Sequence, residues 1–304
     1  MIRRLIALCM AVAAVAAIVP AAFACSQCQC GMPFPPDALG GPAPQRVRLG
    51  LEERYLAKQN ALEDVPGVEQ EREHHVGAFA VARVSDRVLL LGRLPYVFKE
   101  ITEEPVGDVS ATSKSDGIGD AELTALMKLH EFALGGERAA LLSLVGGTRL
   151  PTGANQLKDD TGVRLDEHLQ TGTGGWSGVL GADLLVPLSA MRLDLNVSYR
   201  KNTENSVHYR YGDVFLYNVG VARRVGSVLE LSLQANGRFA QRDDDDGISG
   251  EQTGGSVLYA SPAARLFTGA GIVLEAGAQF PITSALNGEQ EEHATARFAL
   301  SLAR

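Results

Sequence analysis

What the sequence lacks excludes three classes of protein. After residue 24 no uninterrupted apolar run approaches the roughly 18 residues that a membrane-spanning helix needs. The formal net charge is −8 at pH 7, which argues against a nucleic-acid partner. The chain has no Walker loop and no H-E-x-x-H site, and neither His130 nor His293 has a serine within two residues. The sequence therefore predicts neither a helical membrane protein, nor a nucleic-acid-binding protein, nor an enzyme.

The N-terminus has the three parts of a secretory signal. Arg3 and Arg4 form a basic start, residues 5–19 are apolar, and Ala22-Phe23-Ala24 is an A-x-A cleavage site. A retained membrane helix is disfavoured because the apolar stretch is short and ends at Pro20. Residues 1–24 are predicted to be a cleaved signal peptide, so the mature chain is exported.

The exported part contains a series of segments in which apolar and polar residues alternate. In 190–200, for example, Leu193 and Leu195 share one face while Arg192 and Asp194 share the other. Most segments are long enough for a tilted strand to cross the hydrocarbon core of a membrane, which takes about 9–11 residues. The twelve segments are 46–57, 76–84, 88–98, 119–131, 138–150, 175–186, 190–200, 212–224, 228–241, 254–267, 270–282 and 293–303.

The connections between these segments alternate strictly between short and long. Tight turns on one side and longer loops on the other are typical of a transmembrane β-barrel, whose turns face the periplasm. A soluble β-sandwich shares the alternation within strands but has no reason to sort its loops. The short connections are 85–87, 132–137, 187–189, 225–227 and 268–269. The long ones are 58–75, 99–118, 151–174, 201–211, 242–253 and 283–292.

The predicted fold is therefore all-β. We expect an antiparallel transmembrane β-barrel of about 12 strands with up-and-down topology, formed by residues 46–304 in the outer membrane. Counts of ten or fourteen strands stay open, because Pro95 and Pro262 fall inside two segments where a lost N–H is tolerated only at bulges or strand ends. Aromatic residues near one end of several strands predict an interfacial girdle. They are Tyr55, Tyr96, Phe98, Trp176, Tyr199, Phe239 and Phe280.

Two motifs resemble those of a known family. Asp116-Gly117-Ile118-Gly119-Asp120 opens a segment, and Gly147-Thr148-Arg149-Leu150-Pro151-Thr152-Gly153 follows later. The pair is similar to the GxGD and G-x-x-LPTG signatures of the outer-membrane transporters named for the meta-pathway of phenol degradation. The resemblance implies a β-barrel that helps small, often aromatic or apolar, compounds to cross the outer membrane. The chain departs from the usual barrel-assembly signal, because it ends in Arg304 and its nearest candidate aromatic residue is Phe298.

The polar faces of the predicted strands carry many charged residues. These would line a conduit, or they would form cross-strand ion pairs that fill a closed barrel, and both interpretations stay open. The candidate channel-lining residues are Arg48, Asp120, Glu122, Asp183, Arg192, Asp194, Glu230, Arg238, Glu275 and Arg297. Residues 243–246 form an acidic run in a long connection, which we interpret as a solvated loop bridged by divalent ions to lipopolysaccharide.

The predicted mature N-terminus carries a cysteine cluster followed by proline-rich sequence. Cys25, Cys28 and Cys30 have the C-x-x-C-x-C spacing that could hold Cu(I) or Zn, within a periplasmic segment of residues 25–45. A disulfide in an oxidising compartment, a disordered tether and lipidation of Cys25 are the alternatives.

The leading hypothesis is an outer-membrane channel for passive passage of small apolar or aromatic solutes. The alternative is a barrel-anchored protein that binds a soft metal, or is structural, through the N-terminal cysteines. Either one would contact outer-membrane lipid, lipopolysaccharide and the barrel-assembly machinery; the channel would also contact its solute.

Overall fold

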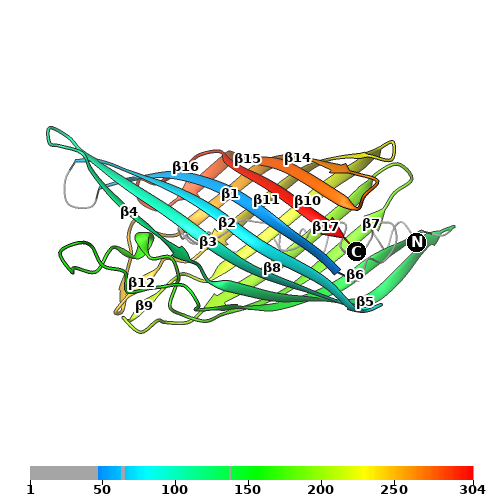
Figure 1. Ribbon diagram of the computed structural model, residues 1–304, viewed down its shortest axis with the longest axis horizontal. Coiled ribbons are helices and arrows are strands. Elements are labelled where there is room, and N and C mark those ends of the chain that lie inside the picture. Colours follow the sequence, from blue (N-terminus) through cyan, green and yellow to red (C-terminus); the bar gives the residue numbers. More distant parts are fainter. Residues whose placement is uncertain (1–46, 63–65, 137, 304) are drawn as a thin grey trace.

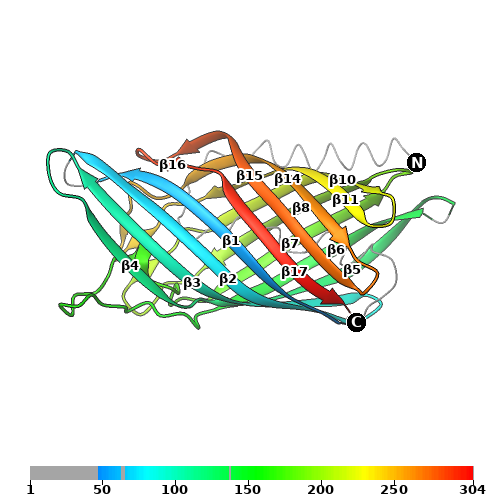
Figure 2. The ribbon, with the colours of Figure 1, turned by 45° about the horizontal axis from the view of Figure 1, so that its top comes forward.

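The molecule is a closed β-barrel (Figures 1 and 2). The structure, a computed structural model, describes residues 47–62, 66–136 and 138–303. The predicted signal peptide and the cysteine segment lie outside these residues. The strands that form the wall are β1 (Val47–Ala61), β2 (Gly67–Ser85), β3 (Val88–Pro105), β5 (Ala121–Gly135), β6 (Arg138–Leu150), β7 (Ser177–Pro187), β8 (Arg192–Asn202), β10 (Val214–Val225), β11 (Leu229–Ala240), β14 (Gly255–Phe267), β15 (Ile272–Leu286) and β17 (Thr295–Ala303). The shorter elements are β4 (Ala111–Ile118), β9 (Tyr209–Arg210), β12 (Asp244–Asp245), β13 (Ile248–Ser249), β16 (Glu291–Glu292) and the 3₁₀ turn η1 (Glu167–Leu169).

Each wall strand pairs antiparallel with the next, and the last pairs with the first. Glu52 of β1 is opposite Gly77 of β2 on one side and Ala299 of β17 on the other, so the sheet has no free edge in the wall. Figure 2 shows β1 lying beside β17 at this seam. The twelve-stranded up-and-down barrel predicted from the sequence is confirmed.

The two ends of the barrel differ in their connections, as the sorting of loop lengths predicts. The turns between β2 and β3, β5 and β6, β7 and β8, β10 and β11, and β14 and β15 gather at the end that holds the C-terminus (Figure 1). The longer connections, with β4, β9, β12, β13 and β16, lie at the other end. The short-turn end is thus the periplasmic one and the long-loop end the extracellular one.

Two of the predicted long loops are wrong. Most of 58–75 and 99–118 is strand, because β1 pairs with β2 as far as Ala61 and β3 pairs with β4 from Tyr96 to Glu103. These hairpins extend past the rest of the long-loop end in Figures 1 and 2. Their sequences lack an apolar face because both faces meet polar surroundings outside the lipid. Alternation therefore missed them.

The two prolines lie where the hydrogen-bond ladder changes. Pro95 sits where β3 stops pairing with β5, at Arg93, and starts pairing with β4, at Tyr96. The ladder between β14 and β15 runs to Ala260 and resumes at Ala263, so it omits Pro262. A proline has no backbone N–H to donate. At both positions the ladder is interrupted on one edge of the strand, so no N–H is needed on that edge.

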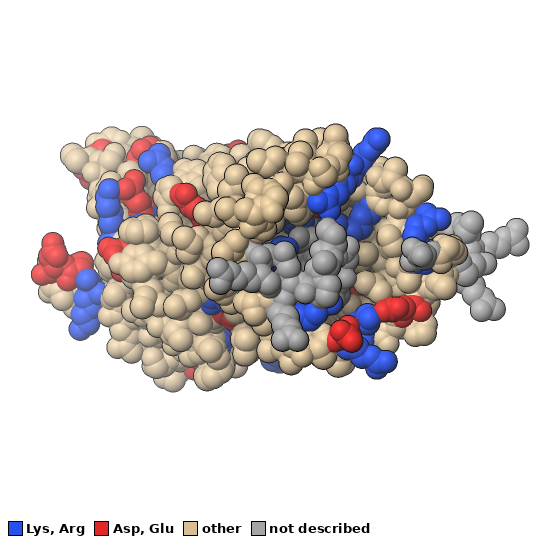
Figure 3. All heavy atoms as spheres, turned by 45° about the vertical axis from the view of Figure 1, so that its right-hand side comes forward, with Lys and Arg blue, Asp and Glu red and all other residues tan. Residues whose placement is uncertain are grey.

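The outer wall is apolar. Leu180 is 63 % exposed and Leu233 is 54 % exposed, values that a water-soluble protein avoids for a whole band of leucines. Figure 3 shows a broad band with few charged side chains, with charges gathered toward the ends. Further exposed outward residues are Leu49, Leu51, Leu123, Val219, Leu231, Leu274 and Leu300. This band faces lipid, so the barrel lies in the outer membrane.

Aromatic side chains mark one boundary of the apolar band. Tyr96, Phe98, Tyr199, Phe280 and Trp176 are exposed, and all lie between the middle of a strand and its long-loop end or next to that end. These five form the predicted extracellular girdle, whereas Tyr55 and Phe239, which were also predicted to belong to it, are half-buried. Within the described residues no helix is long and apolar enough to span a membrane.

Candidate functional site

A belt of ion pairs crosses the inner wall of the barrel. Glu52 of β1 accepts from Arg54 at 2.8 Å and lies 3.3 Å from Arg93 of β3 and 3.1 Å from Arg297 of β17. Arg93 also faces Glu122 of β5, at 3.8 Å. Glu52 and Arg297 stand at opposite ends of the chain, and their strands β1 and β17 are adjacent only because the barrel closes.

The belt continues around the wall. Arg297 donates to Glu275 of β15 at 2.8 Å, and Arg265 of β14 joins Glu275 at 2.7 Å to Glu230 of β11 at 3.1 Å. Arg192 of β8 then contacts Glu230 at 3.4 Å and donates through Nε to both oxygens of Asp194 at 3.0 Å. Burial removes water from each charge, and this loss is compensated only when each charge has partners of opposite sign. In the belt, each carboxylate or arginine shares its partners with the next residue of the series.

The predicted channel-lining residues fall into different environments. Six of them belong to the belt: Glu122, Arg192, Asp194, Glu230, Glu275 and Arg297. Arg238 lies nearer the long loops, where it pairs with Glu292 and donates to Tyr259. Arg48 lies on β1 opposite Val81, toward the short-turn end. The contribution of these residues to conduction stays a prediction. Most of them form cross-strand ion pairs, as the second interpretation of the sequence expected.

Asp120 has a different surrounding from the other candidates. Its carboxylate accepts from the backbone N–H groups of Gly153 and Thr173, at 3.0 and 2.8 Å, and from the Thr173 hydroxyl at 2.6 Å. It therefore ties both ends of the β6–β7 connection to the start of β5. An added Cβ at Gly153 would lie 2.6 Å from the backbone of Gly172, so the motif glycine permits this close approach. Residues of both family motifs thus help to hold the β6–β7 loop in place.

The same loop docks over the barrel wall at the long-loop end. Lys99 of β3 donates to the carbonyl of His168 at 2.7 Å, and the His168 ring lies 3.4 Å from Glu71 of β2. Tyr211 donates to the carbonyl of Glu167 at 3.2 Å. Burial alone would lower the pKa of His168, but the hydrogen bond and charge of Glu71 raise it to about 9.

This docking contact was not predicted from the sequence. Glu71 and Lys99 lie in the two segments that we expected to be loops, yet they are 1 % and 4 % exposed. A signal was present, because Glu69, Glu71 and Glu73 repeat at intervals of two in a polar sequence. Period-two acidic residues can mark a strand that faces a polar interior.

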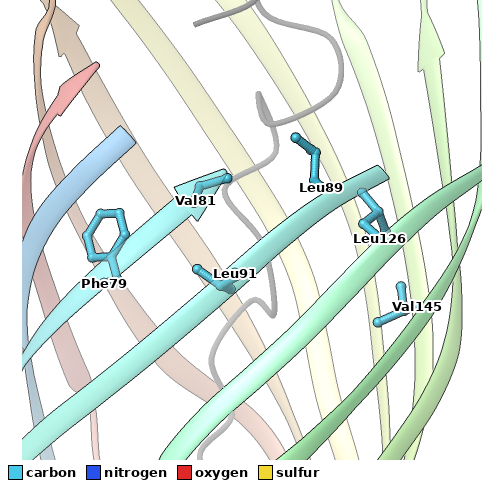
Figure 4. Close-up of a cluster of buried hydrophobic side chains, with 6 residues drawn as sticks. All are labelled: Phe79, Val81, Leu89, Leu91, Leu126 and Val145. Atoms are coloured by element: carbon cyan, nitrogen blue, oxygen red, sulfur yellow. The ribbon is translucent and has the colours of Figure 1, made fainter. Parts of the chain in front are cut away.

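An apolar cluster interrupts the polar lumen on the short-turn side of the belt (Figure 4). The register continues the inward face from Arg93 to Leu91 and Leu89 along β3, and from Glu122 to Leu126 along β5. The cluster consists of Phe79, Val81, Leu89, Leu91, Leu126 and Val145, all nearly inaccessible. The sequence signal was residues 88–91, which are apolar on both faces.

A cavity lies where the wall is least regular. Its lining includes inward residues such as Gln234 and Arg238, and also Tyr55, Ala278 and Ala296, which belong to the outward series of their strands. It lies beside the interrupted β14–β15 ladder and the start of β17 at Thr295. The cavity therefore borders both the lumen and the wall.

The part of the chain that the structure describes contains no cluster of three or more histidine, cysteine, aspartate or glutamate residues suited to a metal ion. Cys25, Cys28 and Cys30 lie outside the described residues, so the soft-metal hypothesis stays a prediction.

Comparison with known proteins agrees with the architecture. The structure is similar to an outer membrane channel from Pseudomonas putida F1, with a TM-score of 0.65 at 16 % identity, over 86 % of this chain and 97 % of the other. It also has a looser likeness to the toluene transporter TbuX of Ralstonia pickettii, with a TM-score of 0.41 at 8 % identity, over 94 % and 95 % of the chains. Among curated proteins, none matches the sequence.

The family is shown by the sequence itself. A family model described as the putative MetA-pathway of phenol degradation matches residues 58–298, which is most of the chain and includes both motifs. The resemblance noted from the motifs is thereby confirmed. The chain belongs to this family of outer-membrane β-barrels.

Proposed function

We propose that the protein is a passive channel through which small apolar or aromatic solutes cross the outer membrane. The apolar cluster in the lumen carries this proposal. A conduit for ions or sugars gains nothing from Leu89, Leu91 and Leu126 on its inner wall, whereas an apolar solute gains about 0.8 kcal/mol for each methylene-sized group that it removes from water.

The order of features along the barrel supports a path. From the long-loop end inward come the docked loop with His168, then the ion-pair belt, then the apolar cluster next to the short turns. The cavity at the β14–β15 irregularity borders both lipid-side and lumen-side residues, so a solute dissolved in the membrane has access there as well. The sequence carries no energy-coupling motif, so flux follows the concentration gradient. Catalysis is not part of the proposal.

The test is uptake of toluene by proteoliposomes or cells that express single variants. Leu91→Asn should reduce the rate of toluene uptake several-fold, because it places an amide in the centre of the cluster. Leu185→Asn is the matched control: Leu185 is an inward leucine on β7, is 5 % exposed and lies outside the cluster. Equal effects of the two substitutions on toluene uptake, with both barrels folded, would refute the role of the cluster.

A further inference from the structure

Asp183 stands apart from the other carboxylates of the inner wall. It lies on the inward face of β7, directly opposite Ser143 of β6 and Asn196 of β8. Glu52, Glu122, Glu230 and Glu275 each have an arginine partner, whereas Asp183 makes no ion pair with any residue of the described chain.

Two cations on nearby strands are already engaged. Arg192 donates to both oxygens of Asp194 at 3.0 Å and reaches Glu230 at 3.4 Å. Lys128, which lies opposite Ser143 on β5, forms an ion pair with Glu131. The Asn196 amide and the more distant charge of Arg192 offset only part of the hydration that the Asp183 carboxylate loses. Because Asp183 forms no ion pair within the described residues, the position favours a positively charged ligand.

Two buried hydroxyl groups flank this carboxylate. Ser143 is 0 % exposed and Ser198 of β8 is 3 % exposed, and neither side-chain oxygen has a hydrogen-bond partner within the described chain. Ser198 lies opposite Gly181, two residues before Asp183, and so occupies the diagonal position. An added Cβ at Gly181 would fall 2.7 Å from the Ser198 Cβ, so the glycine lets Ser198 lean across β7.

The apolar cluster begins beside these three groups. Val145 is two residues from Ser143 on the same inward face of β6, and it pairs with Leu126 of β5. One carboxyl group and two hydroxyls without hydrogen-bond partners in the described residues therefore adjoin an apolar wall. A ligand that fits has a cationic head with several N–H donors and an alkyl group attached to it.

We propose that Asp183, Ser143 and Ser198 bind the ammonium group of a protonated primary amine, with its alkyl group against Val145 and Leu126. A primary ammonium has three N–H donors, enough for the carboxylate and both hydroxyls. The site adds a solute class to the proposed function. It rests on the proposed function in one respect, which is that a solute must be able to enter the lumen. It makes short alkylamines a class of solute that the channel holds selectively.

The experiment is calorimetric titration of the full-length barrel, in nanodiscs of zwitterionic lipid, with n-butylammonium chloride. Asp183→Asn should weaken binding by about tenfold or more, as expected for a lost charge-assisted hydrogen bond. Ser143→Ala should weaken it several-fold. Asp86→Asn, in the exposed turn between β2 and β3, is the charge-matched control and should leave binding unchanged. Unheated electrophoretic mobility checks that each barrel is folded.

A second ligand tests the hydrogen bonds separately from the charge. Butyltrimethylammonium has the same charge and chain but no N–H, so it should bind wild-type protein at least several-fold more weakly than butylammonium. Equal affinity of wild type and Asp183→Asn for butylammonium, or no binding to either, would overturn the site. Failure of the proposed function would give a different result. Butylammonium would still bind, but the rate of toluene uptake would be the same in Leu91→Asn as in wild type.

Discussion

Leu233 on β11 tests whether the apolar face meets lipid. β11 starts at Leu229 beside a short turn, so Leu233 lies four residues, or about 14 Å, along the strand. At a tilt of about 40° this is about 10 Å above the short-turn boundary, close to the middle of an apolar band about 25 Å tall. An arginine near the midplane on the lipid side costs about 2–4 kcal/mol. We therefore expect Leu233→Arg to lower the free energy of unfolding by that amount.

The control is the neighbouring residue on the opposite face. Gln234 is inward and lines the cavity, so Gln234→Arg keeps the charge within the polar interior and should cost less than about 1 kcal/mol. Urea unfolding of protein reconstituted in vesicles can be followed by fluorescence, because Trp176 is the single tryptophan of the chain. If the two arginines lowered the free energy of unfolding equally, the assignment of faces would be refuted.

The remaining predictions concern topology, the docked loop and the cysteines. An epitope tag inserted after Asp160 should be labelled on intact cells and one at Gly226 should not, and the reverse pattern would contradict the orientation of the barrel. The pKa of His168 is raised to about 9, so its pairing with Glu71 stabilises the docked loop fully below pH 6.5 and is lost as the pH rises through about 9. Proteolysis of the β6–β7 loop should accelerate over that range in wild type but not in His168→Gln, and identical profiles would exclude the contact. We also propose that Cys25, Cys28 and Cys30 bind Cu(I) or Zn; Cys28→Ser should then reduce metal bound to the purified protein without altering toluene uptake, and unchanged metal content would remove this hypothesis.

Most of the fold could be predicted because a membrane barrel places lipid on one face of every strand. Alternation in residues 190–200 identified the strand, and β8 begins at Arg192 and ends at Asn202, within two residues of the prediction. The same rule failed for 58–75 and 99–118. There, β1 to β4 extend beyond the apolar band, and strands without an apolar face carry no such pattern.

The candidate site was predictable in composition but not in arrangement. Charged residues at inward positions such as Glu122, Arg192 and Arg297 could be listed from their period, but alternation says nothing about which residues are neighbours across strands. Asp120 shows the difference. Like Glu122 it carries a carboxylate, but it accepts hydrogen bonds from backbone N–H groups of the β6–β7 loop, whereas Glu122 pairs with arginine. His168 was missed because its partners were assigned to loops.

The sequence by itself determined the class of the molecule, the direction in which the strands run and the polarity of each face, since these follow from local period and loop length. Only the tertiary structure decided that Glu52 meets Arg297, that Asp183 forms no ion pair within the described residues, and that six apolar residues from four strands form one cluster in the lumen. The physical reason is register. Contacts across a closed barrel depend on how every strand is offset from its neighbours, and that offset is set by the cooperative closure of the whole sheet.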